Sequence, residues 1–437
     1  MLRKRKASND LSPDTSTTTD YAAPLENRAN GEFGAREQRK TSTDHPLTTH
    51  LSLADQPQRN LATRTLDPKA YTVGWVTALP LELAASVAML DERHEQPYSF
   101  EKASTDRNNY TWGRIGEHNV VIASLPAGVY GTISAATTAS SMLSSFPQIR
   151  VGLMVGIGAG VARPEQGRDI RLGDIVVSQP VGQSGGVIQY DLGKAKTAGR
   201  FERIGSLNMP PEALLKALAK LQAQHELEPS KVPEILEEML RNNPHMAKPK
   251  QGKPGYVFQG EENDRLFEAR YKHTKGLDCR KCDSQQEIAR ARESKDPEIH
   301  YGAIASGNQL IKDGLIRDSI IQEIGEDCIC FEMEAAGLMN SFPCLVVRGI
   351  CDYADSHKND RWQRYAAATA AAYAKEFLGI VPGEDLKKTR NAIDILEESK
   401  LLQMNHGSIT NNKHTQFQNL QLELAIPWKK ANLLSTS

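Results

Sequence analysis

The sequence predicts an α/β protein, with three α/β/α layers around a central mixed, twisted sheet and a helical and loop insertion. Short, continuously apolar segments rich in β-branched residues alternate with helical segments, which is typical of strands buried on both faces of a sheet. The alternation runs from about residue 71 to 178 and resumes from 300 to 381. The region 195–300 interrupts it and is predicted to be an insertion or a mobile lid.

The first block begins at Tyr71, where the composition changes from polar to apolar. Its predicted strands are 71–79, 118–126, 151–161 and 173–178, and its predicted helices are 81–90 and 131–143. Pro80 stands at the start of the first helix, where a missing N–H costs nothing. The third strand is expected to run into a turn formed by its glycines.

The second block follows two predicted helices of the insertion, 210–222 and 232–240. It comprises a strand at 300–310, a helix from about 314, a helix at 331–342, a strand at 344–352 and a long Ala-rich helix at 361–381. Pro382 is expected to end the last helix. The folded domain is therefore predicted to span 71–382.

The two ends of the chain are polar. Residues 1–70 are rich in Ser, Thr, Asp, Asn, Arg and Pro and are predicted to be mostly disordered. The motif RKRK at 3–6 fits a solubilising basic start or a nuclear-import signal. Residues 383–437 are predicted to be a polar tail or a linker.

Charge and hydropathy exclude several classes of partner. The 53 Lys and Arg against 54 Asp and Glu give a net charge of −1, so we expect no nucleic acid and no anionic membrane as partner. No apolar run reaches the roughly 18–20 residues that span a bilayer, and no secretory signal is recognisable. Four of the six cysteines lie in the apolar region 328–351, which suits a reducing compartment. We expect a cytoplasmic protein, with the nucleus as the alternative.

Two sequence patterns resemble cofactor or metal motifs. The segment 155–161 carries Gly156, Gly158 and Gly160, which let a backbone approach a ligand, but the spacing is not that of a dinucleotide-binding turn. The CRKC motif at 279–282 has His273 six residues before it, and His300 could complete a zinc set. With no second cysteine pair, the motif favours free thiols, and we expect no metal and no cofactor.

Carboxylates mark two further segments. Glu332 and Glu334 stand two residues apart in FEMEAAG at 331–337, so one can face a pocket while the other caps a helix. Asp352 ends the apolar strand 344–352, where ligands bind in open α/β sheets. There it is either a strand-end cap or, in apolar surroundings that raise its pKa, a general acid.

Six ordered segments resemble the purine/uridine phosphorylase superfamily. They are the strand leading to Glu82, then GIGAG (156–160), GDIVVS (173–178), IASGNQ (304–309), FEMEAAG (331–337) and RGICDYAD (348–355). The resemblance extends over about 71–381 and is greatest to the 5′-methylthioadenosine/S-adenosylhomocysteine nucleosidases and to nucleoside-phosphorylase-like domains of fungi. It implies the nucleoside phosphorylase fold and cleavage of the N-glycosidic bond of a purine nucleoside or nucleotide.

The resemblance also implies roles for individual residues. Asp352 would protonate the purine at N7, Glu334 would hold the ribose hydroxyls with Met333 packed against the sugar, and Glu82 would activate the attacking water. The remaining predicted substrate-binding residues are Asn308, Leu310, Ile311, Gly156 and Gly158. Glu332 is expected to be structural.

Several positions depart from the family pattern. Asn308 stands where an Asp is common, Cys351 where a Ser precedes the catalytic Asp, and Ala127 where a Ser is usual. Met154 occupies the place of a phosphate-binding arginine, and Glu82 would repel a dianion, so hydrolysis is favoured. Phosphorolysis with orthophosphate is the alternative, because Arg163 or an arginine of a neighbouring subunit could bind the phosphate.

A non-enzymatic alternative is a nucleoside-sensing or effector module of a fungal immune-type receptor. The resemblance further implies a homo-oligomer, because related sites lie near subunit interfaces.

Overall fold

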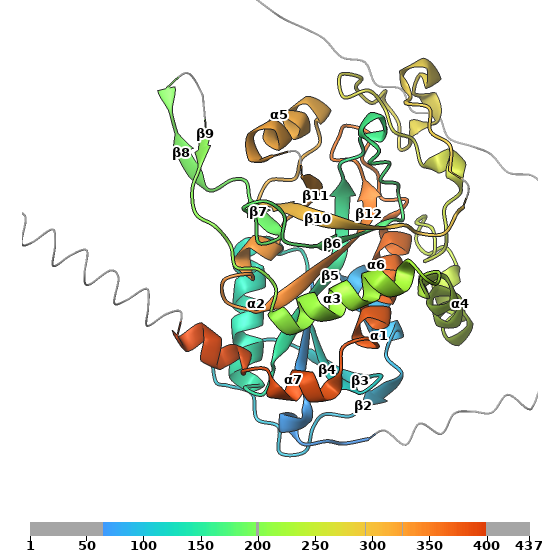
Figure 1. Ribbon diagram of the computed structural model, residues 1–437. Helices are drawn as coiled ribbons and strands as arrows, with labels where there is room; N and C mark the ends of the chain where they lie inside the picture. The colour runs from blue at the N-terminus through green and yellow to red at the C-terminus, as the bar shows by residue number, and fades with distance from the viewer. Residues whose placement is uncertain (1–63, 198–200, 293, 326, 399–437) are drawn as a thin grey trace, which may run out of the picture. The chain divides into compact units, whose positions relative to one another are not determined.

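The computed structural model of the chain describes residues 64–197, 201–292, 294–325 and 327–398 (Figure 1). Most of the segment predicted to be disordered, including the basic motif at 3–6, lies outside the described residues, as does the chain from 399 on. Within the described ranges, no helix combines the length and the hydropathy that crossing a membrane requires.

The described residues build a ten-stranded mixed sheet, which confirms the predicted fold class. The strand order is β11-β10-β6-β12-β5-β1-β4-β3-β2, and β7 pairs with β10. The strands are β1 (Val73–Thr77), β2 (Glu92–His94), β3 (Tyr110–Ile115), β4 (His118–Ser124), β5 (Val151–Gly160), β6 (Ile175–Ser178), β7 (Val187–Gln189), β10 (Ile299–Ser306), β11 (Cys328–Glu332) and β12 (Cys344–Asp352). A separate hairpin joins β8 (Gly193–Ala195) to β9 (Phe201–Arg203).

One part of the sheet closes on itself. Strand β11 is parallel to β10 and also pairs antiparallel with β5, through Cys330 to Gly160 and Phe331 to Ala159. The predicted glycine turn is therefore wrong, because β5 continues as a strand to Gly160. A Cβ at Gly158 would lie 2.6 Å from the sulfur of Cys330, so the glycines serve the close approach of β11.

Helices cover the sheet, with α2 packed beside β1 and β4, and α6 lying on β5 and β12 (Figure 1). The α-helices are α1 (Pro80–Ala88), α2 (Thr132–Ser145), α3 (Glu212–His225), α4 (Val232–Asn242), α5 (Gly314–Ile324), α6 (Gln363–Leu378) and α7 (Gly383–Lys388). Short 3₁₀ helices are η1 (Pro68–Ala70), η2 (Pro164–Gln166), η4 (Pro244–Ala247), η5 (Glu261–Asn263), η6 (Cys279–Lys281), η7 (Ser284–Gln286) and η8 (Ala335–Gly337). The small side chains of α6 let it approach the strands closely, as the Ala-rich sequence predicts.

Segments outside the two predicted blocks also reach the core. In α3 and α4, Leu214, Leu218 and Leu236 are buried in the main hydrophobic cluster, so part of the region predicted as an insertion or lid is packed on the domain. Leu386 and Leu396 are buried there too, and the folded part therefore extends beyond the predicted end at 382. Both segments are mostly polar, and only a few apolar residues anchor them.

The predicted helix at 331–342 is wrong. Glu332 ends β11, and its carboxylate accepts hydrogen bonds from the N–H groups of Glu334 (3.1 Å) and Ala335 (3.0 Å). Only the single turn η8 follows, and a Cβ at Gly337 would lie 1.9 Å from the carbonyl oxygen of Thr132 in α2. Tertiary contacts thus override the helical propensity of this Ala-containing segment.

The contact between β12 and α6 generates a prediction about stability. A Cβ at Gly349 would lie 1.8 Å from the carbonyl oxygen of Ala366, and backbone atoms cannot yield as a side chain can. We expect Gly349→Ala to lower the free energy of unfolding by on the order of 3 kcal/mol, measured by urea denaturation. Gly379→Ala, at the end of the same helix with its nearest atom at 3.2 Å, should be nearly neutral. Equal losses in the two variants would contradict this packing.

Candidate active site

A cavity of about 240 Å³ lies where β5, β11 and β12 approach their carboxyl ends. Of the nine predicted catalytic and substrate-binding residues, seven line it: Glu82, Gly158, Leu310, Ile311, Met333, Glu334 and Asp352. Gly156 and Asn308 do not. Glu332, which the sequence analysis expected to be structural, also lines the cavity wall. The other lining residues were not predicted as site residues: Ala78, Leu79, Tyr130, Ile157, Ala159, Gln309, Phe331, Cys351, Ala354, Lys358 and Gln363.

Glu82 is fixed by backbone donors from the turn before α1 and from strand β5. It lies in the first turn of α1, where one carboxylate oxygen accepts from the N–H groups of Ala78 (2.7 Å) and Leu79 (2.8 Å). The other oxygen accepts from Ile157 of β5 at 2.8 Å. A Cβ at Gly156 would lie 2.5 Å from this carboxylate, so Gly156 makes room for Glu82 and does not touch the cavity. Burial raises the pKa of Glu82, although these donors and Arg348 oppose the shift.

Arg348 supplies the positive charge beneath the cavity. It lies in the middle of β12 with 1% of its side chain exposed, and its guanidinium donates to Glu332 and, at 3.3 Å, to Glu334. A third hydrogen bond reaches the carbonyl oxygen of Ile157 at 3.2 Å. The sequence signal that could have identified it is an arginine inside an otherwise apolar strand, since a buried charge requires partners.

The two glutamates of FEMEAAG differ in their surroundings. Glu332 accepts two backbone N–H groups and the Arg348 guanidinium, which suits the structural role expected from the sequence. Glu334 has a longer contact, 3.4 Å, from the N–H of Gly131 at the start of α2. Burial, reinforced by the carboxylates of Glu332 and Glu82, outweighs Arg348 and raises the pKa of Glu334 to about 7.

Asp352 ends β12 in surroundings more polar than the sequence suggested. One carboxylate oxygen accepts from the N–H of Ala354 at 3.0 Å, and the other pairs with the ammonium group of Lys358. The sulfur of Cys351 lies 3.2 Å from that second oxygen, so the thiol retains a contact to the carboxylate. Burial alone would lower the pKa of Lys358, but the charge of Asp352 raises it above its usual range.

Asn308 is a positioning residue in this structure. Its side-chain oxygen accepts from the N–H (3.1 Å) and the hydroxyl (3.0 Å) of Thr132, the first residue of α2. Its side-chain nitrogen donates to Asp191 at 3.1 Å. These bonds tie the loop after β10 to α2, while the following residues Leu310 and Ile311 reach the cavity.

The arrangement can hold a ligand that has one apolar, flat part and one part rich in hydroxyl groups. Met333, Ile157 and Phe331 provide apolar surface, and Phe331 is held edge-on by Tyr190 at 5.6 Å between ring centroids. Buried carboxylates accept hydrogen bonds from hydroxyl groups, and the Asp352–Lys358 pair can hold a proton.

The raised pKa of Glu334 predicts a pH-dependent stability. Because the folded state holds this proton more tightly than an unfolded glutamate of pKa 4.5, the contribution of Glu334 is complete below that value and is lost as pH rises through about 7. We expect Glu334→Gln to flatten the decline in unfolding free energy between pH 5 and pH 8 by on the order of 1 kcal/mol per pH unit, measured by urea denaturation. Glu237→Gln on the exposed face of α4 should leave the slope unchanged. An equal pH slope of the unfolding free energy in the wild type and in Glu334→Gln would refute the assignment.

Arg348 generates a second prediction. Arg348→Met leaves the carboxylates of Glu332 and Glu334 buried without their cation, so we expect a loss of about 3–5 kcal/mol in unfolding free energy at pH 8. Adding Glu332→Gln to this variant should restore part of the lost unfolding free energy. Arg241→Met, at an exposed position of α4, is the matched control. A loss no larger than that of the control would show that the cluster does not depend on Arg348.

Sequence comparison finds relatives of two kinds, and no protein-family model matches the chain. Over 327 residues the chain is 48% identical to a nucleotide-binding leucine-rich repeat (NLR)-like protein of Hyaloscypha variabilis, covering 75% of this chain and 31% of that protein. Over 318 residues it is 25% identical to the ATP nucleosidase Cap17 of Escherichia coli, covering 69% of this chain and 50% of that one. The chain thus spans about a third and about half of the length of these relatives.

Solved structures of similar chains include two nucleoside hydrolases. A 5′-methylthioadenosine/S-adenosylhomocysteine nucleosidase from Neisseria meningitidis is 14% identical, covers 70% of this chain and 98% of its own, and has a TM-score of 0.44. The futalosine hydrolase of Helicobacter pylori is 15% identical, covers 71% and 97%, and has a TM-score of 0.42. The mixed α/β sheet and the sequence relatives together confirm the resemblance of this chain to the nucleosidases of the purine/uridine phosphorylase superfamily.

Proposed function

We propose that the protein cleaves the N-glycosidic bond of a purine nucleoside or nucleotide by hydrolysis. The observation that supports this most strongly is the convergence of Glu82, Glu334 and Asp352 on one cavity, from the start of α1 and from the ends of β11 and β12. Breaking this bond requires a stabilised leaving base, an oriented sugar and an activated nucleophile. One carboxylate is available for each of the three tasks.

In the proposed reaction, Asp352 gives a proton to N7 of the purine as the bond between C1′ and N9 breaks. In the Asp352–Lys358 ion pair the proton is on the Lys358 ammonium, so Lys358 passes a proton to the Asp352 carboxylate as Asp352 protonates N7, and solvent then reprotonates Lys358. Glu334 accepts hydrogen bonds from the ribose hydroxyls, and Met333 packs against the sugar. Glu82 takes a proton from the attacking water, whose oxygen forms the new bond to C1′. Burial, which raises the pKa of Glu82, makes it a stronger base than an exposed glutamate.

The charges around the cavity favour water over phosphate as the nucleophile. Among the described residues that line the cavity, none is an arginine, and Lys358 is engaged with Asp352. Met154 is fully buried on β5, and Arg163 is not part of the cavity wall. The Arg348 guanidinium already faces the carboxylates of Glu332 and Glu334, so a phosphate dianion would meet net negative charge.

Similarity to an ATP nucleosidase supports the nucleotides among the candidate substrates. The similarity to an NLR-like protein favours a second candidate function, a nucleoside-sensing or effector module of an immune-type receptor. In that role the same cavity would bind the ligand without turnover or deplete a nucleotide as an effector.

Exposed apolar side chains support the predicted homo-oligomer. Val129, Tyr130 and Ile133 are exposed around the start of α2, and Leu310 and Leu315 around the loop into α5. Tyr130 and Leu310 also line the cavity, so a second copy packed there would complete its mouth.

Release of free base tests the proposed function. We expect adenine, hypoxanthine or guanine to be released from at least one member of a panel of adenosine, inosine, guanosine, methylthioadenosine and ATP, without added phosphate. Asp352→Asn should lower kcat by about 10²–10⁴, because it removes the acid, and Glu82→Gln should do the same by removing the base. Asp360→Asn, at an exposed position of the same loop, should retain wild-type turnover.

Release only in the presence of phosphate, with ribose 1-phosphate as product, would replace hydrolysis by phosphorolysis. Equal ligand binding by wild type and Asp352→Asn, with no base released by either, would favour the sensor. Turnover that survives in both Asp352→Asn and Glu82→Gln would refute the assigned roles.

A further inference from the structure

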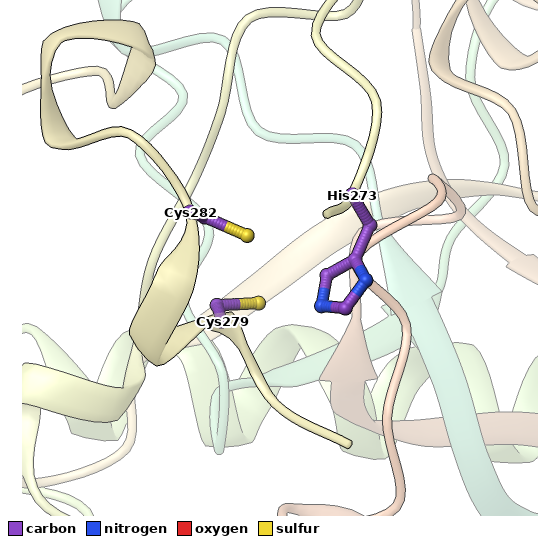
Figure 2. Close-up of side chains that lie close together, drawn as sticks. All are labelled: His273, Cys279 and Cys282. Carbon is purple, nitrogen blue, oxygen red and sulfur yellow. The ribbon is translucent and has the colours of Figure 1, made fainter. Parts of the chain in front are cut away.

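Three metal-ligating side chains meet outside the cavity. A nitrogen of His273 and the sulfurs of Cys279 and Cys282 all lie within 4.8 Å of one another. Figure 2 shows both sulfurs pointing toward the imidazole ring. His300, which the sequence suggested as a further ligand, is bound to Asp174 at 2.9 Å and does not belong to this group.

We propose that His273, Cys279 and Cys282 hold a structural Zn²⁺ ion. A Cys-x-x-Cys turn with a nearby histidine is the ligand type and spacing that Zn²⁺ prefers. Two thiolates balance the charge of the ion, so the bound group is neutral in this half-buried position. Bound zinc needs its ligand atoms about 3.5–4 Å apart, which follows from Zn–S and Zn–N lengths of about 2.3 and 2.0 Å, so an inward movement of about 1 Å suffices.

Local hydrogen bonds orient the ligands before any ion arrives. Cys279 begins η6, and the N–H of Cys282 donates to the carbonyl oxygen of Cys279 at 3.0 Å, which turns both sulfurs to one side. Nε2 of His273 lies 3.1 Å from the carbonyl oxygen of Asp278, so the ring is held beside the turn. The hydroxyl of Thr274 lies 3.6 Å from the sulfur of Cys282. At metal sites, hydrogen bonds from surrounding groups hold the metal-binding side chains in their orientation.

His357 lies beside the Cys–Cys–His group. Its ring is buried, and neither ring nitrogen has a hydrogen-bond partner among the described residues; the Asp355 carboxylate is 3.4 Å from Nδ1. Its ring centroid lies 5.5 Å from that of His273, and its carbonyl oxygen is 3.9 Å from the sulfur of Cys279. Buried unpartnered nitrogens are costly. However, no nitrogen of His357 lies within 4.8 Å of all three ligand atoms, so we assign the fourth coordination position to water.

The other group of possible ligands, Asp174, Glu298 and His300, has a different explanation. Arg292 pairs with Asp174 at 2.7 Å, and His300 and the N–H of Glu298 supply further hydrogen bonds to the same carboxylate. Its charge is therefore already neutralised by the protein. In the part of the chain that the structure describes, no cation is hydrogen-bonded to the sulfurs of Cys279 and Cys282, because Arg265 donates to the carbonyl oxygen of Cys279 and not to its sulfur.

The proposed ion would anchor a segment that has few apolar anchors. Between 264 and 290, Leu266, Phe267 and Cys282 are the buried apolar side chains. The N–H of His273 donates to the hydroxyl of Ser356 at 2.9 Å, so zinc would join this segment to the loop that follows β12. The zinc proposal does not rest on the proposed hydrolysis, because none of its three ligands lines the cavity.

Metal analysis of the full chain tests the inference. The protein is purified with a histidine-free tag from cells grown with added Zn²⁺, and zinc is measured by mass spectrometry. We expect roughly one zinc per chain in the wild type, and almost none in the double variant Cys279→Ser, Cys282→Ser. His245→Gln, exposed in η4, and Cys344→Ala, distant from the motif, are the matched controls and should keep the ion.

Titration of the wild type with Co²⁺ provides a readout that does not depend on how well the variants fold. Titration of metal-free wild type with Co²⁺ should produce a thiolate-to-Co²⁺ charge-transfer band that Zn²⁺ abolishes, and His273→Gln should weaken Co²⁺ binding by more than about tenfold. Removal of zinc by a chelator should lower the Tm of the wild type and not that of the double variant. Absence of both zinc and the cobalt band in protein with reduced cysteines would overturn the proposal.

Discussion

The buried guanidinium of Arg348 is the charge on which the cavity depends. It lies in the central strand β12 and reaches two carboxylates, Glu332 and Glu334, that the strand pairing of β11 brings to it. A buried carboxylate without a cation would lose its charge or destabilise the fold. With one guanidinium for several carboxylates, part of the cluster remains protonated near neutral pH, as the raised pKa of Glu334 shows. The cavity therefore keeps hydrogen-bond acceptors and a proton in a dry site.

Closure of the sheet brings these groups together. Pairing of β11 with both β10 and β5 turns the end of β11 toward the start of α1, so that Glu334 and Glu82 share one wall. Gly156 and Gly158 on β5 permit this, because any side chain there would displace Glu82 or the sulfur of Cys330. The glycine-rich segment thus acts through close packing of strands and not through a phosphate-binding turn.

The sequence predicts most of the fold but only seven of the 19 residues that line the cavity, for different reasons. Long apolar strands such as 344–352 and the Ala-rich helix at 361–381 depend on hydropathy alone, and both appear within a few residues of their expected bounds. The helix predicted at 331–342 fails because Glu332, a residue of high helix propensity, uses its side chain to form a turn. Local patterns do not contain such tertiary contacts.

Among the site residues, Glu82, Glu334 and Asp352 could be predicted from the ordered motifs, whereas the partners of Arg348 and Lys358 could not. Their role depends on which carboxylate each one meets across the fold. Asn308 illustrates the converse, since it directly precedes the cavity-lining residues 309–311 but its amide bonds face α2 and Asp191.

The loop after β12 joins the cavity to the segment that carries the proposed zinc site. Asp352 and Lys358 line the cavity on one side, and on the other they line a smaller hollow together with Cys279 and His357. The position of the Lys358 ammonium therefore depends on contacts made outside the sheet. A change in the 264–290 segment can reach the Asp352 carboxylate through this loop without disturbing any strand, because the segment touches residues 356 and 357 directly. Asp352 ends β12 and pairs with β5, whereas Lys358 lies in the loop, so the ammonium group is the member of the pair that contacts outside the sheet position.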